Sequence, residues 1–199
     1  MTLASGTPDD AARRPARAAV GPDRSRLLFV VNDAGYFLSH RAPIAAAAIA
    51  AGWEVHVAVP ASARCRQIAA LGAAVHPIAM SRAGLHPLGN LRTVVELFAL
   101  YRRLRPAVVH LIALKAVALG GAAARLAGVR ARVFAIAGLG HVFAQSGPRS
   151  RLLRAGFRLL LPWLVGRSGR LIVQNDADLA WARAAGVDGL SAMAPVTEA

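Results

Sequence analysis

The sequence predicts an α/β domain in which helices cover a doubly wound parallel sheet. Short apolar runs of strand length alternate with longer helical segments, beginning with LLFVVN at 27–32. The hydrophobic fraction is 56%, which suits a sheet that is buried on both faces. Domains of this class place their binding sites outside the carboxyl ends of their strands.

The first half of the chain contains three expected strands. A helix at 38–51 follows the first strand and ends at Gly52, and a second strand at 54–59 ends at Pro60. Gly72 then stands in the favoured position just past a helix. In order, these later segments are a helix at 63–71, a strand at 74–79 and a helix at 91–104 with one apolar stripe.

The second half repeats the alternation of strand and helix. Pro106 ends the preceding helix, and Gly128 closes the helix that follows the fourth strand. The expected strands are 107–111, 131–137 and 171–174, and the expected helices are 117–126, 149–165 and 178–185. About six strands therefore form a single Rossmann-like sheet.

The length of 199 residues suits one domain with a full core. Residues 1–25 lack periodicity and the apolar core of a signal peptide, so we expect a disordered leader there. The domain is expected to span 26–188. Residues 189–199 are expected to form a tail or the start of an interdomain segment.

Charge is distributed unevenly along the chain. There are 24 basic and 10 acidic residues, and the stretch 97–175 contains thirteen Arg or Lys but no Asp or Glu. A field of one sign attracts phosphates, anionic lipids or nucleic acid, or it belongs to a solvated surface without a ligand. Aromatic residues make up 6% and are not interleaved with the basic ones, so we expect no nucleic-acid partner.

Cysteine chemistry and metal chemistry receive little support. Cys65 is the single cysteine, which excludes an internal disulfide and fits a reducing, cytoplasmic compartment. We find no metal-binding spacing, no Ser-His-Asp order and no P-loop. The sequence therefore predicts no metal site and no self-contained hydrolytic site.

The loop after the first strand is the first candidate for a binding site. It has only one glycine, Gly35, and lacks the G-x-G-x-x-G pattern that binds a dinucleotide. It instead carries polar, aromatic and basic side chains at a helix N-terminus: Asn32, Asp33, Tyr36, Phe37, Ser39, His40 and Arg41. This set suits a hydroxyl-rich or phosphate-bearing ligand. Alternatively, Asp33 or Ser39 only caps the helix and Phe37 belongs to the core.

Three further loops are expected at the same edge of the sheet. The candidates there are Ser81 and Arg82, with Gly84 and His86, after the third strand; His110 and Lys115 around the end of the fourth; and Gly138, Gly140 and His141 after the fifth. Lys115 is the only lysine and could meet a phosphate, although it could also be a surface residue. His110 is either a ligand contact or a core histidine, and the two glycines either approach a ligand or form a tight turn.

The helix at 149–165 has a basic face and an apolar face. Arg151, Arg154 and Arg158 share the basic face. Such a pattern can bind an anionic membrane surface, or it can pack on the core with its arginines in solvent. Pro162 is expected to kink or end this helix.

The order of these pieces resembles the N-terminal domain of family 4, GT-B fold glycosyltransferases of bacterial polysaccharide assembly. The resemblance covers about 26–187. It rests on the runs LLFVVNDAGYFLSHRAPIAAAAIAAGWEVHVAVP, HPIAMSRAGLHPLGNLRTVVELFALYRRLRPAVVHLIALKAVALGGAAARLAGV, AIAGLGHVF and LIVQNDAD.

The resemblance implies that the chain is one of two Rossmann-like domains that face each other across a cleft. This half would bind the acceptor, often a lipid-linked sugar, with 32–41, His110, Lys115 and 138–141 lining the cleft. A donor domain or separate subunit would bind the nucleotide sugar, and this chain would bind no cofactor.

By the same resemblance, sugar transfer would be retaining and metal-independent, in the cytoplasm or peripherally on the inner membrane face. Without a donor domain the chain is expected to be inactive. The alternative function is a non-catalytic protein of the same fold that binds a membrane or a polyanion.

Overall fold

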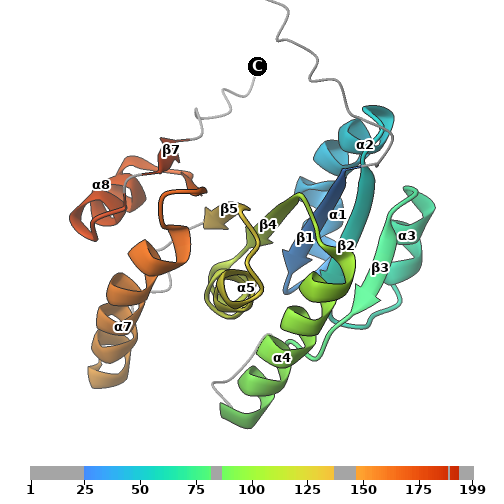
Figure 1. Ribbon diagram of the computed structural model, residues 1–199. Helices are drawn as coiled ribbons and strands as arrows, with labels where there is room; N and C mark the ends of the chain where they lie inside the picture. Colours follow the sequence, from blue (N-terminus) through green and yellow to red (C-terminus); the bar gives the residue numbers. More distant parts are fainter. Residues whose placement is uncertain (1–24, 82–86, 137–146, 188, 193–199) are drawn as a thin grey trace, which may run out of the picture.

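The computed structural model describes residues 25–81, 87–136, 147–187 and 189–192. These residues form a parallel sheet of seven strands in the order β3-β2-β1-β4-β5-β6-β7 (Figure 1). The strands are β1 (Arg26–Val31), β2 (Glu54–Val59), β3 (Ala74–Pro77), β4 (Val108–Ile112), β5 (Ala131–Ile136), β6 (Gly169–Val173) and β7 (Leu190–Ala192). The predicted doubly wound α/β fold is confirmed.

The strand order reverses between β1 and β4, the point at which open α/β sheets bind ligands. Six of the strands lie where the sequence predicts them, and β7 is an addition. It falls in the segment that we expected to be a tail, where it pairs with β6 through Ile172 and Ser191.

Helices connect the strands, and two of them replace one predicted helix. The helices are α1 (Ala34–His40), α2 (Ala42–Ala50), α3 (Cys65–Ala70), α4 (Pro87–Leu104), α5 (Leu114–Leu126), α7 (Pro148–Val165) and α8 (Asp176–Ala184). The predicted helix at 38–51 is interrupted at Arg41 because Pro43 cannot donate a backbone hydrogen bond and therefore starts a new helix, α2. Pro162 does not end α7, which continues to Val165.

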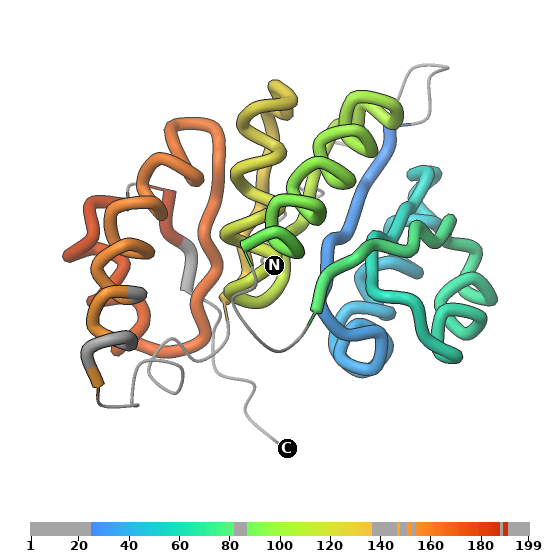
Figure 2. The backbone as a smooth tube through the Cα atoms, turned by 90° about the horizontal axis from the view of Figure 1, so that it is seen from below, coloured from blue at the N-terminus to red at the C-terminus, as the bar shows by residue number. Residues whose placement is uncertain are grey.

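The core has two layers, one on each face of the sheet. Leu28 and Val30 point to the layer covered by α4, α5 and α7, and Phe29 and Val31 point to the layer that contains Phe37 and Ile68. Figure 2 shows α7, α5 and α4 side by side along one face.

Candidate functional site

The candidate site lies at the carboxyl ends of β1 and β4. Val31 and Ile112 are paired at this edge. Helix α1 begins directly after β1, so most of the predicted loop 32–41 is helical. Asp33 caps this helix, because its carboxylate accepts a hydrogen bond of 2.7 Å from the backbone N–H of Tyr36.

Residues of α1 differ in what they offer to a ligand. Phe37 is fully buried and packs edge-on against the ring of Phe29, so its predicted role in lining the cleft is wrong and it belongs to the core. Ser39 donates a hydrogen bond to the carbonyl of Gly35 at 2.9 Å and lies 2.7 Å from Nδ1 of His40. The His40 ring also stacks on Tyr36 with centroids 4.3 Å apart. Ser39 and His40 therefore form an exposed, locally ordered pair.

Gly35 permits a close approach by Arg64, a residue that the sequence did not single out. A Cβ atom at Gly35 would collide with the Arg64 guanidinium. The absence of a side chain thus lets a cation from the start of α3 reach the first turn of α1. The signal in the sequence was the glycine, but its partner could not be read from the sequence because the two residues belong to different elements.

Arg41 and His110 form the most unusual part of the site. Each is 8% exposed, and Nε of Arg41 and Nε2 of His110 are buried without a hydrogen-bond partner among the described residues. Burial and, to a smaller extent, the positive charge of Arg41 together lower the pKa of His110 to about 4. His110 is therefore neutral at pH 7. A buried cation and a neutral imidazole together can donate hydrogen bonds to oxygen atoms of a ligand.

Lys115 connects two of the predicted loops. Its ammonium group donates a hydrogen bond of 2.9 Å to the backbone carbonyl of Ser81, which follows β3. Lys115 lies in the first turn of α5, and Ala113, the residue just before this helix, has φ of 73° and ψ of 152°. This conformation is strained for a residue with a Cβ atom, and such strain gathers at functional sites.

The structure thus brings part of the predicted set to one edge. Asn32, Ser81 and Lys115 lie at or near the carboxyl ends of β1, β3 and β4. His110 instead lies in the middle of β4, opposite Phe29 of β1, and Arg41 follows the last residue of α1. The remaining predicted residues Arg82, Gly84, His86, Gly138, Gly140 and His141 lie outside the described residues.

Helix α7 has the predicted buried face, but its arginines have different roles. Arg151 is exposed, Arg154 is half-buried, and Arg158 donates a hydrogen bond of 2.7 Å to the carbonyl of Ala184 in α8. Arg158 therefore ties two helices together. A second apolar stripe, missed by the sequence analysis, is exposed on α7 at Leu152 (75%) and Leu159 (80%).

Helix α4 also exposes large apolar side chains. Leu88 is 83% exposed, and Leu91 and Val95 continue the same stripe along the helix. Helices in this fold run opposite to the strands, so the first turns of α4 and α7 lie towards the carboxyl edge of the sheet. Exposed apolar stripes of this kind mark contacts with proteins or membranes.

A separate network of polar side chains connects β1, β2 and β3. Arg26 forms an ion pair of 2.9 Å with Glu54, whose second oxygen lies 3.1 Å from Nε2 of His56. Nδ1 of His56 in turn lies 3.0 Å from Nε2 of His76. Burial lowers the pKa of both histidines. These residues interact mainly with one another and stabilise the edge of the sheet.

The described ranges contain neither a cluster of metal-binding side chains nor a membrane-spanning helix. No group of three or more His, Cys, Asp or Glu residues is placed there to hold a metal ion. No helix in the same ranges is long and apolar enough to cross a membrane.

The strand order and the polar carboxyl edge define the chain as a Rossmann-like α/β domain. Residues 26–175, well over half of the chain, match the family described as glycosyl transferase 4-like. The chain therefore belongs to this family. No match was found among curated proteins.

Solved structures show the same fold. The chain is similar to a glycosyltransferase of Rickettsia africae at a TM-score of 0.58 and 11% identity, covering 85% of this chain and 42% of that one. Alr3699/HepE of Anabaena in complex with UDP-glucose aligns with a TM-score of 0.55 and 17% identity, covering 84% of this chain and 43% of that one. A UDP-N-acetylglucosamine 2-epimerase aligns with a TM-score of 0.58 and 11% identity, covering 84% of this chain and 45% of that one. The chain thus spans less than half the length of these structures.

Proposed function

We propose that this chain is the acceptor-binding half of a glycosyltransferase that moves a sugar from a nucleotide sugar to a lipid-linked or polysaccharide acceptor. A donor domain, on a further segment or a separate subunit, would bind the nucleotide sugar. Family membership supports the class of reaction. The presence of UDP-glucose in the similar Anabaena protein supports a donor of the nucleotide-sugar class.

One observation carries the assignment of the acceptor site: the buried pair formed by Arg41, at the end of α1, and His110, in the middle of β4. Each has a buried nitrogen without a partner in the described part of the chain. A phosphate or hydroxyl oxygen of an acceptor would satisfy both nitrogens. The protonated guanidinium favours a phosphate, and His110, which is neutral because its pKa is lowered, adds no second charge.

Sugar transfer in a reconstituted system tests this proposal. The chain is combined with a donor domain of the same family whose nucleotide-sugar binding has been verified. Transfer of a labelled sugar to a polyprenyl-diphosphate-linked sugar is then measured. We expect transfer only when both proteins are present. Absence of transfer despite nucleotide-sugar binding by the donor domain would contradict the proposal.

The second candidate function, non-catalytic binding to an anionic membrane, is favoured by the exposed stripes on α4 and α7. Leu88, Leu91, Leu152 and Leu159 offer apolar side chains, and Arg151 is exposed beside the α7 stripe. Apolar insertion combined with attraction of arginine to anionic headgroups is the usual basis of such binding. The same surface would serve a transferase whose acceptor is lipid-linked.

Flotation with vesicles containing an anionic phospholipid tests the membrane surface. Replacing Leu88, Leu91, Leu152 and Leu159 by Ser is expected to lower the bound fraction strongly, and Arg151→Ser is expected to lower it less. Arg66→Ser with Arg183→Ser serves as the control, because both arginines are exposed on other helices. If the leucine variant and the control float equally well, the membrane surface lies elsewhere.

A further inference from the structure

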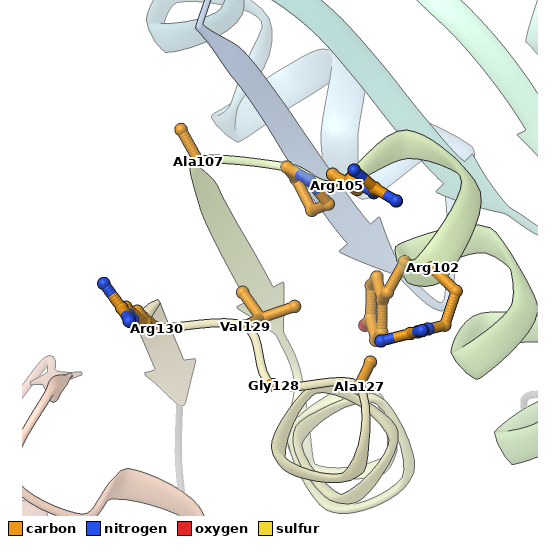
Figure 3. Close-up of a pocket in the computed structure, with 9 residues that line it drawn as sticks. Arg102, Arg105, Ala107, Ala127, Gly128, Val129 and Arg130 are labelled. Carbon is orange, nitrogen blue, oxygen red and sulfur yellow. The ribbon is translucent and has the colours of Figure 1, made fainter.

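A hollow lies at the opposite end of the strands from the candidate acceptor site. It has a volume of about 380 Å³ and is bounded by the end of α4 and the start of β4 on one side and by the end of α5 and the start of β5 on the other. Arg102 and Arg105 lie on the α4 side, and Arg130 lies across the hollow beside β5 (Figure 3). Pro106 and Val129 contribute apolar wall.

The hollow is strongly basic and is not neutralised locally. None of its lining residues is acidic, and all of them come from a stretch of sequence without any Asp or Glu. The structure gives the side chains of Arg102, Arg105 and Arg130 no ion pair or hydrogen bond within its described ranges, and all three are exposed. Their charges are therefore available to a ligand.

A neighbouring arginine shows what a structural role looks like here. The guanidinium of Arg132 is buried and donates hydrogen bonds to the carbonyls of Leu164 and Val165 at the end of α7, and also to that of Val129. All three guanidinium nitrogens of Arg132 thus donate hydrogen bonds to backbone carbonyls. The three arginines of the hollow have no such bonds within the described ranges.

Arg105 provides an independent indication. Its φ is 47°, a left-handed conformation that usually selects Gly at the end of a helix. Its N–H donates to the carbonyl of Tyr101 at 2.8 Å, which closes α4 in the way that a Gly would. An arginine at this position costs about 1 kcal/mol in backbone strain relative to Gly. The fold therefore holds a basic side chain at the hollow at some cost in stability.

We propose that this hollow, defined by Arg102, Arg105 and Arg130, binds a small ligand that carries a diphosphate or more than one phosphate group. A guanidinium group can donate two parallel hydrogen bonds to phosphate oxygens, and several guanidinium groups together can balance the charge of an anion with several negative charges. The volume is sufficient for more than one phosphate, and the apolar wall suits an organic part of the ligand. The site is separate from the carboxyl edge and does not depend on the proposed transferase function.

Isothermal titration with inorganic pyrophosphate at low salt tests the proposal. We expect saturable binding of one pyrophosphate at this hollow, in addition to any pyrophosphate bound at Arg41 and His110. Arg102→Ser with Arg130→Ser is expected to weaken it by about tenfold or more, as expected for the loss of charge-assisted hydrogen bonds. The matched control Arg66→Ser with Arg183→Ser removes the same charge from other helices and is expected to leave the affinity within about twofold.

Arg105→Gly separates binding from folding. Glycine relieves the left-handed strain, so this variant is expected to unfold at a temperature no lower than that of the unaltered protein while losing about tenfold in pyrophosphate affinity. No saturable binding, or equal weakening in the control pair, would overturn the proposal. Pyrophosphate binding that Arg105→Gly leaves unchanged would also overturn it.

The phosphate could belong to a free metabolite or to a lipid headgroup, and competition distinguishes these sources. Vesicles containing a lipid with a diphosphate headgroup are floated with and without saturating pyrophosphate. Release of the protein by pyrophosphate, together with loss of flotation in the Arg102 and Arg130 variant, would identify a headgroup. Unchanged flotation in both cases alongside the predicted titration would identify a free ligand.

Discussion

At the scale of single residues, burial divides the polar residues of the candidate site into two groups. Ser39 and His40 are exposed and hydrogen-bonded within α1. Arg41 and His110 are buried, each with a nitrogen that lacks a partner in the described part of the chain. Leaving a buried polar atom unsatisfied costs about 1–3 kcal/mol, so this pair destabilises the isolated chain and favours a bound ligand.

His110 makes the stability of the protein dependent on pH. Its pKa falls from 6.5 in the unfolded chain to about 4 in the folded one, so the unfolded state takes up a proton first as the pH decreases. The free energy of unfolding should decrease by up to about 3 kcal/mol through this group between roughly pH 6.5 and 4. His56 and His76 act in the same direction because burial also lowers the pKa of each.

Urea unfolding at pH 7 and pH 4.5 measures this dependence. His110→Gln removes the titrating group, so the difference in unfolding free energy between the two pH values should be smaller in the variant by about 2 kcal/mol. The remaining dependence belongs to the other histidines and the carboxylates. An identical difference in both proteins would show that His110 titrates normally.

Ala113 is expected to be a site of backbone strain. Because its φ and ψ of 73° and 152° are favourable mainly for glycine, Ala113→Gly should raise the free energy of unfolding by about 1 kcal/mol. The greater flexibility of glycine in the unfolded chain offsets part of the gain. Ala116→Gly, at a buried helical position in α5, is the control and should lower stability. Destabilisation of similar size by both substitutions would show that the backbone of Ala113 is not strained.

At the scale of elements, much of the fold could be predicted because a buried parallel strand is a short apolar run. The strands predicted at 54–59 and 131–137 correspond to β2 and β5. The start of α1 at Ala34 lies before the predicted helix start at 38, because it depends on the cap provided by Asp33 rather than on an apolar stripe. Strand β7 was missed because it has only three residues, and its pairing with β6 is a tertiary interaction.

Helix α8 depends on a reciprocal interaction at its start. The side-chain oxygen of Asn175 accepts a hydrogen bond of 2.8 Å from the backbone N–H of Asp178, and its amide donates one of 3.0 Å to the Asp178 carboxylate. Asp178 is 2% exposed. Asn175→Ala should therefore lower the free energy of unfolding by about 1–2 kcal/mol, measured by urea unfolding. Gln174→Ala, an exposed neighbour, should change it by less than about 0.5 kcal/mol, and equal effects would contradict this role of Asn175.

At the scale of the whole molecule, the sequence could predict which residues share an edge but not how they are used. The carboxyl ends of parallel strands meet at one edge, which is why Arg41, His110 and Lys115 could be grouped in advance. Their burial and partners depend on packing between distant elements, as in the bond from Lys115 to the carbonyl of Ser81. The basic hollow at the amino ends of β4 and β5 could not be predicted from the sequence because Arg102 and Arg130 are far apart in it.

The charge of the whole chain adds to both proposed phosphate sites. A formal charge of +14 raises the local concentration of anionic ligands and makes their association sensitive to salt. Specific sites must therefore be distinguished from general attraction by variants with equal change in charge. Arg66 provides that control for Arg41, because it is an exposed arginine on α3.

The KM for the acceptor in the reconstituted transfer assay tests the central claim most directly. Arg41→Gln removes the buried cation, and it is expected to raise the KM for a polyprenyl-diphosphate-linked sugar by about tenfold or more while the KM for the nucleotide sugar stays within about twofold. Arg66→Gln should change neither value. A normal KM for the acceptor in folded Arg41→Gln, or an equal rise with Arg66→Gln, would contradict the assignment of the Arg41 and His110 pair to the acceptor site.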